Sequence, residues 1–272
     1  MTMITLLASA LLVGASPSCS APDGTTRLLD QPQRVIVVGE AHGTVEAPAA
    51  FLGVVCEAVR RGPVTIGLEM SESDRPLMDQ FMAAPDEAGA RRVLQYGDFG
   101  HPGRRDGRHS RAMMDMMLGF WRLRDAGRDI TLHPFLPLIS RVQLSDQAWR
   151  ELEMGYSMSR AFVSRPDARL LVLVGDLHAR KTPMAGFPEI GIPAAGHLPA
   201  PDTLSLHFAQ QGGESWGCQD VCGLQTTVTD YDPQAKGVIL GTVSEGAYDG
   251  VLAVGQTTAS PPATLPRDPA SK

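Results

Sequence analysis

The sequence predicts an α/β fold with a mostly parallel sheet and helices on both faces. Short apolar runs, each long enough for a buried strand, alternate along the chain with segments in which apolar residues recur at helical spacing. Such alternation is typical of parallel strands that are joined by helices. The chain has 272 residues, which is enough to bury a sizeable core in one domain with insertions.

The expected strands are the short apolar runs. Continuous runs of this length are consistent with strands that are covered on both faces of a sheet. The four clearest runs are separated by segments long enough to hold a helix. Strands are expected over residues 35–38, 64–70, 130–133 and 170–174, and shorter ones over residues 204–208, 238–240 and 251–254.

The expected helices lie between these strands. The first helical segment ends at Gly62-Pro63, and the second is interrupted by Pro85, because proline and glycine do not continue a helix well. Ser110 precedes the third segment and is expected to cap it. Helices are expected over residues 46–61, 75–96, 111–126 and 144–164.

A loop rich in glycine and arginine, residues 97–110, separates two of these helices. Arg104, Arg105 and Arg108 lie close together in it, beside Asp106. Arginine binds oxyanions bidentately, so one interpretation is an anion clamp over a site. The alternative is a solvated surface loop.

The N-terminus carries a short apolar segment, residues 6–15, with the length of a signal-peptide core. We expect a leader over residues 1–21, one α/β domain over residues 22–260 and a Pro-rich, disordered tail over residues 261–272. The leader predicts export to the periplasm or the extracellular space. A lipid anchor on Cys19 is an alternative that the preceding residues fit poorly, and no later segment reads as an integral membrane span.

The cysteines fit an exported protein. Cys218 and Cys222 bracket three residues in a Gly-rich loop, and this spacing predicts a local disulfide. A thiol metal pair is the alternative for these two residues. Cys56 lies in an apolar helical segment and is expected to belong to the core.

Charge and missing motifs exclude several classes of protein. The formal net charge is −6 at pH 7 and no Lys/Arg stripe is present, so we expect no nucleic-acid partner. The sequence has no G-x-S-x-G elbow, no H-E-x-x-H zinc motif and no P-loop. The expected partner is a small-molecule substrate.

A four-residue motif occurs twice, each time directly after an expected strand. G-E-A-H ends at His42 and G-D-L-H ends at His178, so each copy has a glycine, a carboxylate, one further residue and a histidine. In an open α/β sheet, ligands bind beyond the carboxyl ends of the strands. Two such corners would bring two imidazoles and two carboxylates together, which is enough for metal binding or acid–base chemistry. A single copy would be read as an ordinary turn.

The candidate site residues come from these strand ends and from the arginine loop. Glu69 ends the second strand, where a carboxylate is expensive to bury unless it has a partner. Its structural alternative is an ion pair with an arginine of the loop. The expected catalytic residues are Glu40, His42, Glu69, Arg108 and His178, and the expected metal ligands are His42, His178, Glu69 and Asp176.

Other histidines and the methionines are expected to be structural. His133, His197 and His207 each stand alone beside a strand or in a loop. The helix over residues 111–126 contains two pairs of methionines, which we interpret as core packing. The alternative for these methionines is an apolar pocket for a greasy substrate or a porphyrin.

The two motifs, together with the longer sequence over residues 37–48, resemble a superfamily that joins the erythromycin esterases, the Tiki and TraB proteins and the ChaN-type haem-binding lipoproteins. The ChaN-like branch is the most similar. The resemblance implies an α/β fold with both motifs at one end of the sheet, and it matches Glu40, His42, Glu69 and His178 to the family's motif positions. It also implies three different activities, because erythromycin esterases hydrolyse a lactone, Tiki proteins are metal-dependent proteases and ChaN-type proteins bind haem.

We expect an exported hydrolase that activates water for attack on an ester, lactone or phosphoester. In one version His42, His178 and a carboxylate hold a divalent metal, which lowers the pKa of bound water towards roughly 7. In the metal-free version Glu40 or Glu69 takes the proton from water, and Arg108 stabilises the oxyanion. The alternatives are a haem- or iron-binding protein without turnover and a Tiki-type metallopeptidase.

Overall fold

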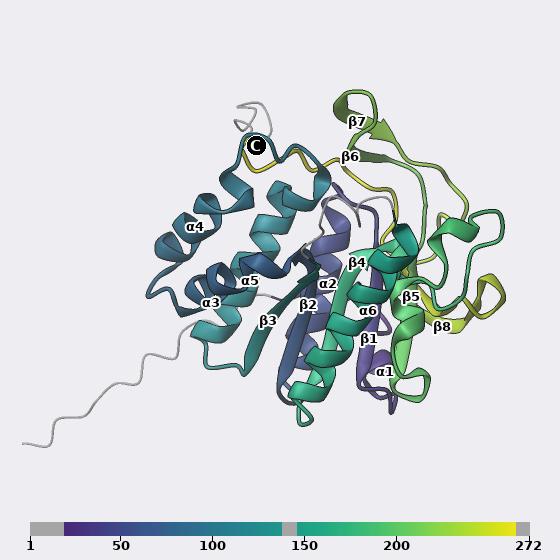
Figure 1. The fold of residues 1–272 in the computed structure, drawn as a ribbon, viewed down its shortest axis with the longest axis horizontal. Coiled ribbons are helices and arrows are strands. Elements are labelled where there is room, and N and C mark those ends of the chain that lie inside the picture. The colour runs from purple at the N-terminus through teal and green to yellow at the C-terminus, as the bar shows by residue number, and fades with distance from the viewer. Residues whose placement is uncertain (1–18, 138–145, 265–272) are drawn as a thin grey trace, which may run out of the picture.

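The computed structural model describes residues 19–137 and 146–264, and its centre is a seven-stranded sheet (Figure 1). The strand order is β3-β2-β4-β1-β5-β9-β8, and every neighbouring pair is parallel except β8 and β9. The predicted fold class is therefore confirmed. The strands are β1 (Val35–Glu40), β2 (Val64–Ser71), β3 (Ile130–Leu136), β4 (Arg169–Gly175), β5 (Thr203–Phe208), β8 (Gly237–Val243) and β9 (Tyr248–Ala253).

Both faces of the sheet are buried, and this explains the continuous apolar runs in the sequence. Successive side chains of a strand point to opposite faces. On β1, Ile36 and Val38 join the core on one face, whereas Val35 and Val37 join the core on the other. Because neither face of β1 meets water, every one of these positions favours an aliphatic residue.

Helices cover the two faces. The first core contains the buried sides of α2, α3, α4 and α5, and the second contains Met154 and Met158 of α6. All four methionines of α5 are buried in the first core, as the sequence predicts. The helices are α1 (Thr25–Leu29), α2 (Glu46–Ala58), α3 (Arg75–Ala83), α4 (Glu87–Tyr96), α5 (Arg111–Asp125), α6 (Gln147–Ser164) and the single turn α7 (Asp176–Ala179).

Helix ends follow local chemistry. The break at Pro85 separates α3 from α4, and the Asp86 side chain caps α4 by accepting the backbone N–H of Gly89 at 2.6 Å. The Ser110 hydroxyl caps α5 in the same way by accepting the N–H of Met113. These ends were therefore predictable from residues within one turn.

The sequence did not predict the two strands of a hairpin that lies outside the main sheet. The hairpin consists of β6 (Glu214–Cys218) and β7 (Cys222–Thr226), closed by the predicted disulfide between Cys218 and Cys222. Most of its side chains are exposed or half-buried, so it lacks the apolar pattern by which strands are recognised. Figure 1 shows the hairpin at the top of the molecule, near the C-terminal segment of the described chain.

A second disulfide joins Cys19 to Cys56. Cys56 is buried, as predicted, but its bond to Cys19 was not anticipated. A sulfur atom in a disulfide cannot carry a thioether-linked lipid, so the alternative of a lipid anchor on Cys19 is wrong for this structure. The carbonyl of Ser20 lies directly over Gly53 of α2, which leaves no room for a Cβ there. Cys19 and Ser20, which the expected leader includes, thus pack against α2.

The last described residues form part of the fold. The N–H of Ser260 donates to the carbonyl of Gly43 at 2.7 Å, and the N–H of Arg111 donates to the carbonyl of Pro261 at 2.9 Å. Residues 261–264, which were expected to belong to the tail, therefore lie against the start of α5. Residues 1–18 and 265–272, where the rest of the leader and of the tail are expected, lie outside the described residues.

The two disulfides indicate an oxidising, exported environment. Among the helices of residues 19–137 and 146–264, none is long and apolar enough to cross a membrane.

Candidate active site

The two repeated motifs meet at the carboxyl ends of β1 and β4. These strands are neighbours, and their register places Glu40 opposite Gly175. A Cβ added to Gly175 would lie 3.0 Å from His42 Nε2 and 3.4 Å from both Glu69 Oε2 and His178 Cδ2. His42, Glu69 and His178 therefore surround Gly175, and the absence of a side chain there leaves room for them.

His42 lies between two buried carboxylates. Its Nδ1 is 2.9 Å from Glu40 Oε1, and its Nε2 is 3.4 Å from Glu69 Oε2. Burial disfavours a charged imidazole, but the charges of Glu69 and Glu40 outweigh it and raise the pKa of His42 to about 10. At neutral pH, His42 is therefore an imidazolium held by both of its nitrogens.

Glu69 is the hub of the site. Its Oε2 accepts the backbone N–H of Gly175 at 2.9 Å, and its Oε1 accepts Nε–H of Arg108 at 2.9 Å. Burial favours the neutral acid, but the cations of His42 and Arg108 outweigh it and hold the pKa of Glu69 well below its usual range. Glu69 is thus a carboxylate whose negative charge is already paired with the cations of His42 and Arg108.

His178 has a different carboxylate partner. Its Nδ1 lies 2.7 Å and 2.9 Å from the two carboxylate oxygens of Glu151, which is fully buried on α6. Glu151 also accepts the N–H of Ala194 at 3.0 Å and the amide of Gln147 at 2.6 Å. Glu151 thus accepts from three donors, one of which is Nδ1 of His178. Nε2 of His178 has no partner among the described residues.

Glu151 and its neighbour Arg150 were not expected at the site. Both lie in the helix that was expected over residues 144–164, and Arg150 Nη2 is 4.0 Å from Glu69 Oε1. Glu151 shares the buried face of α6 with Met154 and Met158. A carboxylate on the apolar face of an expected helix needs a partner, and this is the signal that could have found it.

Asp176, in the second motif, belongs to a separate cluster. Its Oδ1 accepts the N–H of Phe208 at 2.7 Å, and its Oδ2 lies 2.9 Å from both His207 Nδ1 and the hydroxyl of Tyr248. These partners direct Asp176 toward β5 and β9. The structure brings three of the four expected metal ligands together, His42, His178 and Glu69, and it places Asp176 with other partners.

A metal fits this arrangement poorly. Both nitrogens of His42 face carboxylates, and a ligating imidazole needs a free lone pair. No group of three or more His, Cys, Asp or Glu side chains within residues 19–137 and 146–264 is arranged to hold a metal ion. We therefore derive no chemical step through a metal.

The arginine loop supplies one side chain to the site. Arg108 pairs with Glu69, whereas Arg104 is half exposed and pairs with Asp98 at 3.1 Å. Asp106 accepts the N–H of Arg108 at 3.1 Å and lies 3.4 Å from Nδ1 of His109. The hydrogen bond from His109 and the nearby charge of Arg108 lower the pKa of Asp106 to about 2, although burial opposes the shift.

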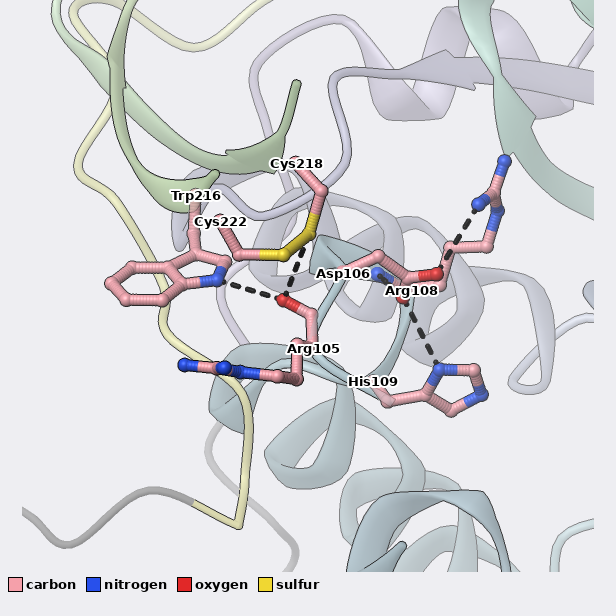
Figure 2. The surroundings of a disulfide bond; sticks show 7 residues. All are labelled: Arg105, Asp106, Arg108, His109, Trp216, Cys218 and Cys222. Carbon is pink, nitrogen blue, oxygen red and sulfur yellow. Dashed lines mark hydrogen bonds and ion pairs between the residues drawn. A yellow bond between two sulfur atoms is a disulfide. The ribbon is translucent and has the colours of Figure 1, made fainter. Parts of the chain in front are cut away.

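The disulfide-bonded hairpin holds this loop in place (Figure 2). The indole N–H of Trp216 donates to the carbonyl of Arg105 at 2.9 Å, and Cys218 Sγ is 3.5 Å from the same oxygen. Figure 2 shows Trp216 and the disulfide on one side of Asp106, with Arg108 and His109 on the other. The hairpin thus contacts the loop on one side. On the other side of the loop, Arg108 extends to Glu69.

The remaining histidines lie outside the site. His133 Nε2 is 3.1 Å from the hydroxyl of Ser157, and burial together with Arg75 lowers the pKa of His133 to about 4. His197 Nε2 is 3.0 Å from a backbone carbonyl. A surface cavity lined in part by Arg34 and Arg169 lies where the strands begin, which is the opposite end of the sheet.

Comparisons with known proteins show which solved structures have a similar fold. No protein-family model matches the sequence, and no curated protein matches it. A mutant of the erythromycin esterase EreC in its open conformation is 13% identical, with a TM-score of 0.60 over 85% of this chain and 92% of that chain. A succinoglycan biosynthesis protein is 10% identical, with a TM-score of 0.56 over 87% of this chain and 91% of that chain. ChaN of Campylobacter jejuni, in a structure of cofacial haem binding, is 11% identical, with a TM-score of 0.46 over 84% of this chain and 89% of that chain.

At these identities the likeness concerns the fold, and the ChaN similarity is too low to support an argument. The fold that the resemblance implies is confirmed. This chain has the α/β fold of the erythromycin esterase type, and its two G-x-x-H motifs lie at one end of the sheet, as the resemblance implies.

Proposed function

We propose that this protein is a hydrolase in which His178 and Glu151 activate water for attack on an ester. The observation that carries the proposal is the contact of His178 Nδ1 with both oxygens of a fully buried carboxylate. A buried carboxylate on Nδ1 fixes the tautomer and stabilises the imidazolium that forms when Nε2 takes a proton. The erythromycin-esterase-type fold is compatible with this reaction class but does not establish it.

The proposed reaction begins with water near Nε2 of His178. The water oxygen attacks the ester carbonyl while its proton passes to Nε2. The oxyanion that forms is stabilised by the positive charges of His42 and Arg108, which the site holds fixed around Glu69. When the tetrahedral intermediate collapses, His178 returns the proton to the leaving alkoxide, and the products are a carboxylic acid and an alcohol.

This proposal differs from the expectation that Glu40 or Glu69 is the base. Both carboxylates face the His42 cation, and Glu69 also accepts from Arg108. Proton uptake by Glu69 is unfavourable because its pKa is held low by these cations. We therefore assign to Glu40 and Glu69 the role of positioning His42 and Arg108.

The other candidates have less support. The metallopeptidase alternative needs a metal, and both nitrogens of His42 face carboxylates. The haem alternative depends on an apolar pocket near α5, but the methionines of this helix pack in the core. No observation at the site favours either candidate over ester hydrolysis.

The proposal is tested with Glu151→Gln and His178→Ala on a panel of aryl esters and lactones. We expect kcat to fall by about 10²–10⁴ in each variant, which is the usual contribution of general base catalysis. The double variant should be no slower than either single one, because residues that act as a unit are strongly non-additive.

Glu153→Gln is the matched control, because Glu153 lies on the same helix and is only partly buried. It should retain wild-type kcat. Unchanged kcat in folded Glu151→Gln would refute the assigned base. Loss of activity on chelation that only added metal restores would refute the metal-free reaction.

A further inference from the structure

The site contains a guanidinium group that the proposed reaction does not use. Arg150 lies on α6 beside Glu151, and its side chain is 28% exposed. Its nearest charged contact is Glu69 Oε1, 4.0 Å from Nη2, which is beyond hydrogen-bonding distance. The Nε atom of Arg150 is buried, and among the described residues no hydrogen bond to this guanidinium exists.

Two other half-buried arginines, Arg34 and Arg169, have carbonyl acceptors. Arg34 donates to the carbonyl of Ala168 at 2.8 Å, and Arg169 donates to the carbonyl of Leu29 at 2.8 Å. A partly buried donor without an acceptor costs free energy, because it gives up water and receives nothing in exchange. The cost at Arg150 is explained if a bound ligand supplies the acceptor.

Arg108 offers further donors at the same place. Its Nε bonds to Glu69 Oε1 at 2.9 Å, and its Nη1 is 3.5 Å from Asp106 Oδ2, so Nη2 remains available. Arg108 approaches Glu69 from the arginine loop, and Arg150 approaches the same oxygen from α6. One carboxylate oxygen cannot satisfy two guanidinium groups, each of which has five N–H donors.

We propose that Arg150 and Arg108 together bind an oxyanion of the substrate, so that the substrate is an ester carrying a carboxylate or phosphate group near the scissile bond. Arginine pairs bind such groups through planar, bidentate hydrogen bonds. The substrate class rests on the proposed hydrolase function. Binding of the oxyanion itself does not depend on turnover, and this allows the two ideas to be tested separately.

The first experiment compares two aryl esters that differ in one charge, 4-nitrophenyl hydrogen succinate and its neutral methyl ester. The wild type should prefer the anionic ester in kcat/KM. Arg150→Gln should reduce this preference about tenfold or more, which corresponds to the loss of a charge-assisted hydrogen bond. Arg150→Lys should retain part of the preference, because it keeps the charge without the planar fork.

Arg92→Gln is the control, because Arg92 is exposed on α4 and outside the site. It should keep the wild-type preference. An equal rate for both esters in the wild type, or an unchanged preference in folded Arg150→Gln and Arg150→Lys, would overturn the proposal.

The second experiment measures binding without turnover. Inorganic phosphate and succinate are titrated into the wild type, Arg150→Gln and Arg92→Gln, and the thermal midpoint is followed. A saturable rise with one anion in the wild type and Arg92→Gln, but not in Arg150→Gln, supports the oxyanion site, and the more effective anion identifies its chemistry.

The two ideas fail differently. If an anion binds as expected but no ester in the panel is hydrolysed, the hydrolase proposal is wrong and the oxyanion site stands. If esters are hydrolysed but neither anion binds in competition with them, the oxyanion proposal is wrong and the hydrolase proposal stands.

Discussion

At the scale of single residues, the site consists of buried charges that neutralise one another around Gly175. His42 lies between Glu40 and Glu69, and His178 lies against Glu151. Each carboxylate is almost completely buried, so the loss of its partner would leave an uncompensated charge. The two histidines therefore contribute to the stability of the fold as well as to the chemistry. Histidines that faced solvent at the ends of strands would not contribute to stability in this way.

The His42 ion pairs predict a dependence of stability on pH. The pKa of His42 is raised from about 6.5 to about 10, so the folded state binds this proton more tightly than the unfolded state. The stabilising contribution is complete below pH 6.5, declines as the pH rises above it and is lost above about pH 10. His42→Gln should therefore be less stable than the wild type at low pH and approach it near pH 10.

Urea unfolding at about pH 6, 8 and 10 measures this difference. His101→Gln is the control, because His101 is exposed and outside the site, and it should follow the wild-type curve. A His42→Gln deficit that stays constant between these pH values would contradict the raised pKa.

At the scale of elements, the β6–β7 hairpin positions the arginine loop. Trp216 contributes two bonds, from its indole N–H to the carbonyl of Arg105 and from its backbone N–H to the carbonyl of Gly43, both at 2.9 Å. Gly107 packs so closely on Gly43 that a Cβ would clash with the backbone. The hairpin, the turn after β1 and the loop that carries Arg108 therefore form one packed unit.

This unit makes Trp216 a testable positioning residue. Trp216→Phe removes the indole donor but keeps an aromatic ring, and the freed carbonyl of Arg105 lies on an exposed loop. We expect a loss of stability of about 1 kcal/mol, the value of an ordinary hydrogen bond, and a several-fold rise in KM through looser placement of Arg108. Steady-state kinetics with urea unfolding measures both quantities.

The control for Trp216→Phe is Leu224→Ala on the facing strand, whose side chain is 62% exposed. It should change neither KM nor stability beyond about 0.5 kcal/mol. A wild-type KM in Trp216→Phe would show that the hairpin does not position Arg108.

At the scale of the whole molecule, two disulfides close loops of very different length. Cys19 and Cys56 are 37 residues apart, and Cys218 and Cys222 are four apart. A longer loop removes more conformational freedom from the unfolded chain. The Cys19–Cys56 bond should therefore contribute about 4 kcal/mol and the hairpin bond about 2 kcal/mol.

The paired variants Cys19→Ser/Cys56→Ser and Cys218→Ser/Cys222→Ser test this order by urea unfolding. Thiol counting under denaturing conditions in the exported wild-type protein should find none of these four sulfurs free. Two free thiols at Cys218 and Cys222 would revive the metal-pair alternative, and an equal loss of stability in both variants would contradict the loop-length argument.

The sequence by itself determined the fold class, most helices and strands, the Cys218–Cys222 bond and the set Glu40, His42, Glu69, Arg108 and His178 that meets around Glu69. These features depend on local signals, namely periodicity, capping residues, short spacing and residues that directly follow a strand. Parallel strands that end at one edge bring such residues together whatever lies between them.

Only the tertiary structure decided which charged side chains pair with one another. Glu151 reaches His178 across 27 residues, because α6 packs on the sheet with its buried face toward β4. Asp176 turns toward His207 and Tyr248 because β5 and β9 follow β1 in the sheet. Strand order and helix rotation are set by packing of the whole core, so no local pattern contains them. The buried pairs, and with them the assignment of the base, could be found only after the chain was folded.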